Sequence, residues 1–192
     1  MSTSKEEVCR LINAGLSRLV KETDVLWPGS DAQLPERNLS LYVAHELLNS
    51  GYTAMTEWPF NRNEHIDLVA FEPQERTLLL VESKRSWHRA LEIGWLCDDV
   101  ERCERAARCL DAWTRGKAEQ WQKIDPCEIF GAVLVGSTAI DSLDPGRYRR
   151  GNIGDVIRGL IAKVGPFATI PHIDQEYPYV LHFAVWRIAG SL

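Results

Sequence analysis

The sequence predicts an α/β fold, with a mixed β-sheet of about four to five strands flanked by helices on both faces. Apolar residues recur at helical spacing in about the first 50 residues and again from about residue 87. Between these regions, residues 65–85 (HIDLVAFEPQERTLLLVESKR) contain two apolar runs that are joined by a polar turn around Pro73. Residues 128–137 (EIFGAVLVGS) are almost wholly apolar, which is typical of an interior strand covered on both faces.

The chain is expected to open with two helices. A capping box at Ser4 and the apolar spacing after it predict a helix over residues 4–23. A second helix begins around Pro35, because proline suits the first helical turn, and it runs to Ser50 with Gly51 as its C-terminal cap. We interpret the first helix as a packing helix without chemistry.

Glu36 lies in the first turn of the second helix and projects into its apolar arc, where an acidic residue needs a reason. One explanation is compensation of the helix dipole, worth about 0.3–1 kcal/mol. The other is that Glu36 faces acidic residues of the sheet, a role for which Glu46 is the weaker candidate. The arc consists of Leu39, Leu41, Val43, Ala44, Leu47 and Leu48.

Three charged residues interrupt the two apolar strands of residues 65–85. Asp67 lies in the first strand, and Glu82 and Lys84 lie at the end of the second. Glu82 and Lys84 are two residues apart, so they project from the same face of the strand. If the strands pair through the Pro73 turn, Asp67 comes opposite the end of its neighbour, and two carboxylates and an ammonium converge.

This convergence has two interpretations. Paired carboxylates bind hard divalent cations such as Mg²⁺, and a lysine beside them stabilises charge on a phosphate. A buried ion pair in an ordinary hairpin explains the same residues, because a buried charge must be paired. The short D…ExK pattern alone does not decide between them.

A long helical region follows over residues 87–123, with Gly94 and Gly116 as candidate breaks. We interpret its mixed-charge face, which includes Arg102, as solvated surface. The C-terminal half adds three predicted elements: an interior strand over 128–137, a helix over 153–164 and a strand over 179–188. The sequence has no repeat or linker, so we expect a single domain over residues 1–192.

The composition is that of a soluble globular protein, with 45% hydrophobic and 26% charged residues in a chain of 192. No apolar run approaches the length of a membrane span, and the N-terminus lacks a signal-peptide core. The five cysteines form no disulfide-like framework, which indicates a reducing environment. We therefore expect a cytoplasmic protein without a membrane partner.

The net charge of −5 argues against non-specific coating of nucleic acid, but the charge is segregated. Residues 145–163 carry five basic residues against one acidic residue, a local balance of +4, so the rest of the chain sums to −9. A second basic group follows directly on the strand that ends with Lys84. The candidate nucleic-acid-binding residues are Arg85, His88, Arg89, Arg147, Arg149 and Arg150.

With these residues in this order, the chain resembles the PD-(D/E)XK nuclease superfamily, which has the restriction-endonuclease-like fold. The resemblance spans about residues 34–136. The family's D…(D/E)-x-K core falls on Asp67, Glu82 and Lys84, and its helix glutamate falls on Glu36. The family usually has proline before the aspartate, whereas this chain has Ile66.

The resemblance implies a nuclease, an enzyme that hydrolyses phosphodiester bonds of DNA with Mg²⁺, for which Mn²⁺ would substitute. Asp67, Glu82 and the backbone carbonyl of Ser83 would hold the metal, Lys84 would orient water or stabilise charge, and Glu36 would complete the site. RNA is the alternative substrate, and a homodimer would suit cleavage of both strands. The alternative function is an inactive nuclease-like domain that serves as a nucleic-acid- or protein-binding regulatory module, because this fold hosts both kinds of protein.

Overall fold

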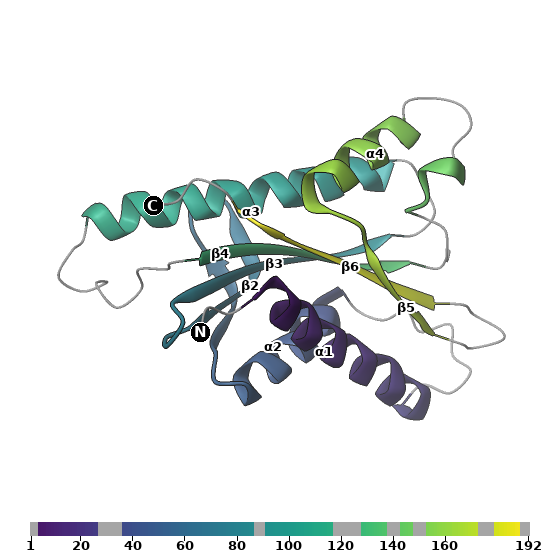
Figure 1. Cartoon of the computed structure of the whole chain (residues 1–192), viewed down its shortest axis with the longest axis horizontal. Coiled ribbons are helices and arrows are strands. Elements are labelled where there is room, and N and C mark those ends of the chain that lie inside the picture. Colours follow the sequence, from purple (N-terminus) through teal and green to yellow (C-terminus); the bar gives the residue numbers. More distant parts are fainter. Residues whose placement is uncertain are drawn as a thin grey trace.

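The computed structural model describes residues 4–26, 36–86, 91–116, 128–137, 143–147, 153–172 and 179–188. In these residues the chain forms a six-stranded sheet of order β1-β2-β3-β4-β6-β5 and four α-helices (Figure 1). In chain order the elements are α1 (Lys5–Leu26), α2 (Glu36–Asn49), β1 (Thr53–Pro59), β2 (His65–Glu72), β3 (Thr77–Ser86), α3 (Leu91–Gly116), β4 (Glu128–Ser137), the 3₁₀ turn η1 (Pro145–Arg147), α4 (Ile153–Val164), β5 (Ala168–His172) and β6 (Tyr179–Arg187). The predicted α/β class is confirmed, although the sheet has six strands rather than four to five.

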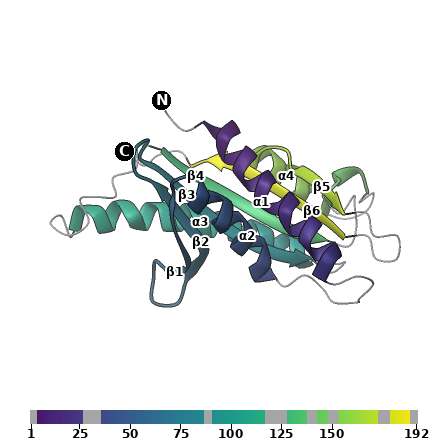
Figure 2. The same cartoon turned by 90° about the horizontal axis from the view of Figure 1, so that it is seen from below.

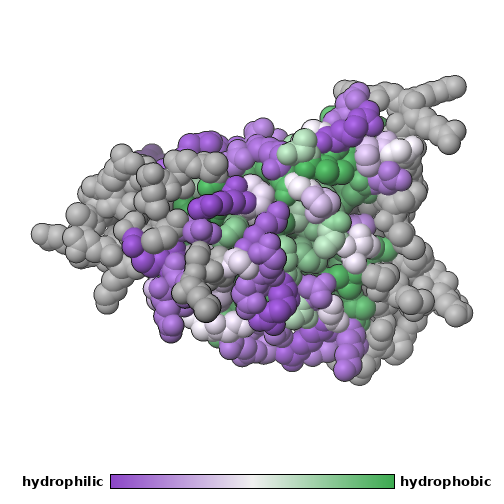
Figure 3. Space-filling view, viewed as in Figure 1, coloured by the Kyte–Doolittle hydropathy of each residue, from purple (hydrophilic) through white to green (hydrophobic). Residues whose placement is uncertain are grey.

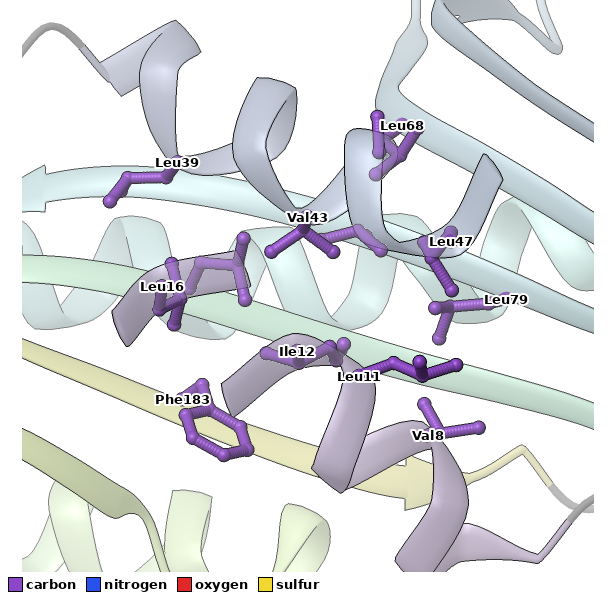
Figure 4. Packing of buried hydrophobic residues seen from close by; sticks show 14 of the residues in the cluster. Val8, Leu11, Ile12, Leu16, Leu39, Val43, Leu47, Leu68, Leu79 and Phe183 are labelled. Carbon is purple, nitrogen blue, oxygen red and sulfur yellow. The ribbon is translucent and has the colours of Figure 1, made fainter. Parts of the chain in front are cut away.

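Helices cover both faces of the sheet, as Figures 1 and 2 show. Helices α1 and α2 pack on one face and α3 and α4 on the other, so two apolar cores are separated by the strands. Figure 4 shows the core under α1 and α2, where Leu16 and Val43 belong to the same buried cluster as Phe183 of β6. Each face of β3 therefore points into a helix-covered layer, which matters for the charged residues at its end.

The sheet is mixed. Strands β1, β2 and β3 pair antiparallel, β3 pairs parallel with β4, and β6 pairs antiparallel with both β4 and β5. The parallel pair needs a crossover connection, which α3 supplies on one face. Every side chain that the structure describes in β4 except Glu128 is buried, so the prediction of an interior strand at residues 128–137 is confirmed.

Two predictions about the helices need correction. The apolar arc of α2 is narrower than predicted, because Leu41 and Leu48 are 56% and 53% exposed while Leu39, Val43 and Leu47 are buried. Of the two candidate breaks in the predicted helix over residues 87–123, Gly94 lies inside the unbroken helix α3, and Gly116 is the last residue of α3 that the structure describes. The predicted cap at Gly51 is confirmed, with a φ of 91° that glycine adopts readily.

Strand β5 was not predicted from the sequence. Its five residues, ATIPH, include Pro171, which weakens the strand pattern. Within the described sheet β5 lies at the edge and pairs with β6 alone, and an edge strand tolerates proline. The edge position is a tertiary property, so the local pattern could not reveal it.

The surface in Figure 3 is hydrophilic along the sides where α1, α2 and α3 lie, and hydrophobic residues show between them. Among the described residues, no helix is both long and apolar enough to cross a membrane.

Candidate functional site

Asp67 lies near the start of β2, beside the end of β3. The antiparallel pairing of these strands begins with Leu68 opposite Val81, so Asp67 stands one residue before the first pair. Its Oδ2 accepts a hydrogen bond of 2.7 Å from the backbone N–H of Ser83. This bond holds the carboxylate at the end of β3, as the predicted hairpin required.

Glu82 and Lys84 lie on the α3 face of β3. The preceding residues in the same alternation, Leu78 and Leu80, pack in the core beneath α3. Glu82 is buried to 1% exposure, whereas the side chain of Lys84 keeps 23% and reaches the surface. The strand thus places a buried carboxyl and an accessible ammonium side by side.

Two residues of α3, Asp99 and Arg102, complete this group and were not predicted as site residues. Arg102 Nη1 donates a hydrogen bond of 2.9 Å to Glu82 Oε2 and lies 3.1 Å from Asp99 Oδ1. Lys84 Nζ lies 3.6 Å from Asp99 Oδ2. The interpretation of Arg102 as solvated surface is therefore wrong, because its guanidinium group donates a hydrogen bond to the buried carboxyl of Glu82.

A signal for Asp99 was present in the sequence. At 100° per residue it falls within the arc formed by the buried apolar residues of α3, which are Leu96, Val100, Cys103, Ala106 and Ala107. Asp99 is thus an acidic residue on the apolar face of a helix, which is the same feature that identified Glu36 as a candidate. Arg102 lies at the edge of this arc, so the sequence alone could not separate it from the solvated face.

The helix glutamate beside the site is Glu36 rather than Glu46. Glu36 Oε1 lies 4.0 Å from Lys84 Nζ, so the first turn of α2 reaches the end of β3. Glu46 instead lies 3.6 Å from Arg18 of α1 and 3.5 Å from its neighbour His45. The structure therefore brings the four predicted catalytic residues to one place.

Burial and like charge act strongly on the acidic residues. Burial raises the pKa of Glu82 to about 9, and the charge of Asp67 acts in the same direction against Arg102. Burial raises the pKa of Asp99 to about 6, opposed by Lys84 and Arg102. Burial also raises the pKa of Asp67, opposed by the hydrogen bond from Ser83. These carboxyls would all be more readily ionised beside an additional cation.

Several buried carboxyl oxygens lack a hydrogen bond within the described part of the chain: Glu82 Oε1 and both oxygens of Asp99. Arg102 is close to Asp99, but the pair lacks hydrogen-bond alignment, so we treat that contact as an ion pair only. Buried polar atoms without a partner are uncommon in proteins, so these three oxygens need an explanation.

Glu36 lines two separate hollows. One of about 310 Å³ is lined by Glu36, Lys84, Trp95, Asp98, Asp99 and Arg102. The other, of about 240 Å³, is lined by Glu36, Arg37, Ser40, Glu57, His65 and Asp67. Lys84 and Asp67 thus line different hollows, and Glu36 in the first turn of α2 lines both.

The second hollow contains a carboxylate and imidazole group that the sequence did not single out as a site. Glu57, His65 and Asp67 each offer one ligand atom within 4.8 Å of the others. Neither Glu57 nor His65 is among the site residues that the sequence predicts. Glu57 has a φ of 53°, which is rare for a residue other than glycine within a strand.

The other predicted site residues stand as follows. Ser83 is buried, and its backbone N–H bonds to Asp67, while the use of its carbonyl as a metal ligand stays a prediction. Arg85 belongs to β3 and Arg147 to η1, but their side chains are not among those described. The remaining candidates for nucleic-acid contact, His88, Arg89, Arg149 and Arg150, lie outside the described residues.

Comparison with protein-family models, curated proteins and solved structures found no match for this chain.

Proposed function

We propose that this chain is a PD-(D/E)XK-like nuclease, which hydrolyses phosphodiester bonds of DNA with Mg²⁺. The observation that carries the proposal is the meeting of three elements at one point. Helix α2 supplies Glu36, β2 supplies Asp67, and β3 supplies Glu82 and Lys84, with Lys84 Nζ 4.0 Å from Glu36. Helix, strand and strand arrive in the order that the resemblance implies.

The charge balance of the site suits a divalent cation. The cluster has two cationic groups, Lys84 and Arg102, against four carboxyls: Glu36, Asp67, Glu82 and Asp99. Fully ionised, this set carries a formal charge of −2, which one Mg²⁺ would neutralise. Glu82 Oε1 is buried and receives no hydrogen bond from the described residues, so it offers a lone pair to a metal.

Each residue of the cluster would have a different role in hydrolysis. Asp67 and Glu82 would hold Mg²⁺, which when bound polarises the scissile phosphate and activates a water molecule as nucleophile. Lys84 stabilises the negative charge that develops on the phosphate oxygens, and its ammonium lines the 310 Å³ hollow where a phosphate could enter. Asp99, 3.6 Å from Lys84, keeps that ammonium at the site.

A second candidate function is an inactive nuclease-like domain that binds nucleic acid or protein. The observation in its favour is that Glu82 is 1% exposed and already bound by Arg102. A closed ion-pair cluster of this kind can serve the fold alone. In that case Mg²⁺ would leave the melting temperature unchanged.

A cleavage assay tests the proposed function. Labelled single-stranded, duplex and branched DNA, and RNA, are incubated with the protein in Mg²⁺, Mn²⁺ or EDTA. We expect metal-dependent cleavage of DNA that falls at least about a hundredfold in Asp67→Asn and Lys84→Ala, because each removes charge stabilisation at the reacting phosphate. Matched controls are Asp155→Asn and Lys21→Ala, which change exposed residues on α4 and α1.

Equal cleavage by wild type and Asp67→Asn would indicate a contaminating nuclease and overturn the proposal. Absence of cleavage, together with a melting temperature that does not respond to Mg²⁺, would favour the binding module. Stabilisation by Mg²⁺ that is lost in Asp67→Asn would count against that module.

A further inference from the structure

Glu57, His65 and Asp67 form a ligand set on the two outermost strands at the β1 edge of the described sheet. Thr56 pairs with Leu68 and Trp58 with Ile66, so Glu57 is level with Asp67. His65 is two residues from Asp67 and therefore lies on the same side of β2. The antiparallel register places two carboxylates and one imidazole at the same level of the two strands.

The distances suit a single ion. Ligand atoms about 2.1 Å from a metal lie about 3.0 Å apart when adjacent and about 4.2 Å apart when opposite. His65 Nε2 and Glu57 Oε2 are 2.9 Å apart, which matches an adjacent pair. All three ligand atoms lie within 4.8 Å of one another, so a shift of less than about 1 Å would close the set.

The group is open to solvent and negatively charged. It lines the 240 Å³ hollow, and the side chains of His65 and Glu57 are 53% and 48% exposed, so both can rotate to meet an ion. The nearby Arg37 lies 3.8 Å from Glu57, but its side chain is 89% exposed. An exposed pair of this kind is weak, so Arg37 does not substitute for a bound cation.

We propose that Glu57, His65 and Asp67 bind a divalent transition-metal ion and prefer Mn²⁺ over Mg²⁺. An imidazole nitrogen suits transition-metal ions, whereas Mg²⁺ takes oxygen ligands and dehydrates reluctantly. Through Asp67 this inference deepens the proposed function, on which it rests for the role of the ion. Binding of the ion itself requires no nucleic acid.

An exposed His–Glu ion pair would explain His65 and Glu57 without a metal, and the chain contains a matched example. His45 is 50% exposed and lies 3.5 Å from Glu46, as His65 does from Glu57 at 2.9 Å. His45 also contacts Arg18 and Asn49, and it does not belong to the group of Glu57, His65 and Asp67. His45→Ala therefore removes a similar pair without touching the ligand set.

The experiment measures Mn²⁺ binding to the whole metal-free chain without nucleic acid. Free Mn²⁺ is quantified by electron paramagnetic resonance, and electron spin echo modulation reports whether a nitrogen nucleus is bonded to the ion. We expect nitrogen modulation in wild type and in His45→Ala but not in His65→Ala. The Kd for Mn²⁺ should weaken at least about tenfold in His65→Ala and Glu57→Gln, because even indirect partners of metal ligands change affinity 10–100-fold.

Mg²⁺ competition supplies the second measurement. The preference for Mn²⁺ over Mg²⁺ should fall in His65→Ala, since only oxygen ligands remain. Unchanged Mn²⁺ affinity and modulation in His65→Ala would overturn this inference while leaving metal-dependent cleavage intact. His65-dependent Mn²⁺ binding without any cleavage would support the inference and overturn the proposed function.

Discussion

Replacing Glu82 by glutamine tests whether this buried carboxyl is neutral in the metal-free protein. Burial, followed by the charge of Asp67, raises its pKa from 4.5 to about 9. Between these two pH values the folded protein holds a proton that the unfolded chain has lost. The stability that the protonated Glu82 carboxyl gives to the folded state is fully present below the unfolded pKa. As pH rises above that value, the free energy of unfolding falls by about 1.4 kcal/mol per pH unit for one proton.

Glutamine is similar in shape and does not ionise, so the variant should escape this loss. We expect the free energy of unfolding of Glu82→Gln, relative to wild type, to increase by about 1.4 kcal/mol per pH unit from pH 6 to pH 8. Asp99, with a pKa raised to about 6, titrates mostly below this range and is present in both proteins. The difference between the two proteins therefore reports Glu82.

The assay is urea denaturation with EDTA at half-unit steps of pH, followed by circular dichroism. Glu64→Gln is the matched control, because Glu64 is bound by Arg105 outside the site at 2.6 Å and that bond lowers its pKa. The difference in the free energy of unfolding between Glu64→Gln and wild type should not vary between pH 6 and pH 8. If the free energy of unfolding of Glu82→Gln relative to wild type is equally independent of pH, the reasoning is refuted, because Glu82 would then be ionised and held by Arg102.

Packing yields two more predictions, both measured by urea denaturation. Gly131→Ala should destabilise the fold by about 1–3 kcal/mol, because its Cβ would lie 2.3 Å from the ring of Trp186. Gly94→Ala, with nothing within 4 Å, should instead stabilise α3 by up to about 1 kcal/mol, and equal effects of the two changes would contradict this account. Leu16→Ala should cost about 2–5 kcal/mol, because Leu16 is fully buried between α1 and the sheet; a loss under about 1 kcal/mol would mean that the site collapses around the change.

The sequence predicted the hairpin and its charges well because both follow from local rules. Alternation along β3 determines that Glu82 and Lys84 share a face, and the turn at Pro73 pairs β2 with β3 so that Asp67 lies beside the end of β3. Glu36 was also within reach of sequence reasoning, because an acidic residue on the apolar side of a helix is unusual. The shared face of Glu82 and Lys84, the hairpin, and the unusual place of Glu36 each follow from the periodicity or the turn of one short stretch of sequence.

The partners of these residues could not be predicted in the same way. Arg102 reaches Glu82 only because α3 crosses above β3 after a connection whose path the sequence does not specify. Glu57 meets His65 through the register of β1 against β2, which periodicity does not determine. Leu41 was assigned to the core because it is apolar, but no element covers that side of α2 among the described residues.

Asp67 joins two halves of the site that differ in their access to solvent. On one side, Glu82 is buried and bound by Arg102, so a cation entering there must displace a proton or the guanidinium group. On the other side, Glu57 and His65 are half exposed, and an ion can exchange its water molecules for ligands one at a time. The open half should therefore bind its ion first. The charge of that ion would in turn favour ionisation of Asp67 and Glu82, so the two halves are expected to fill in order rather than independently.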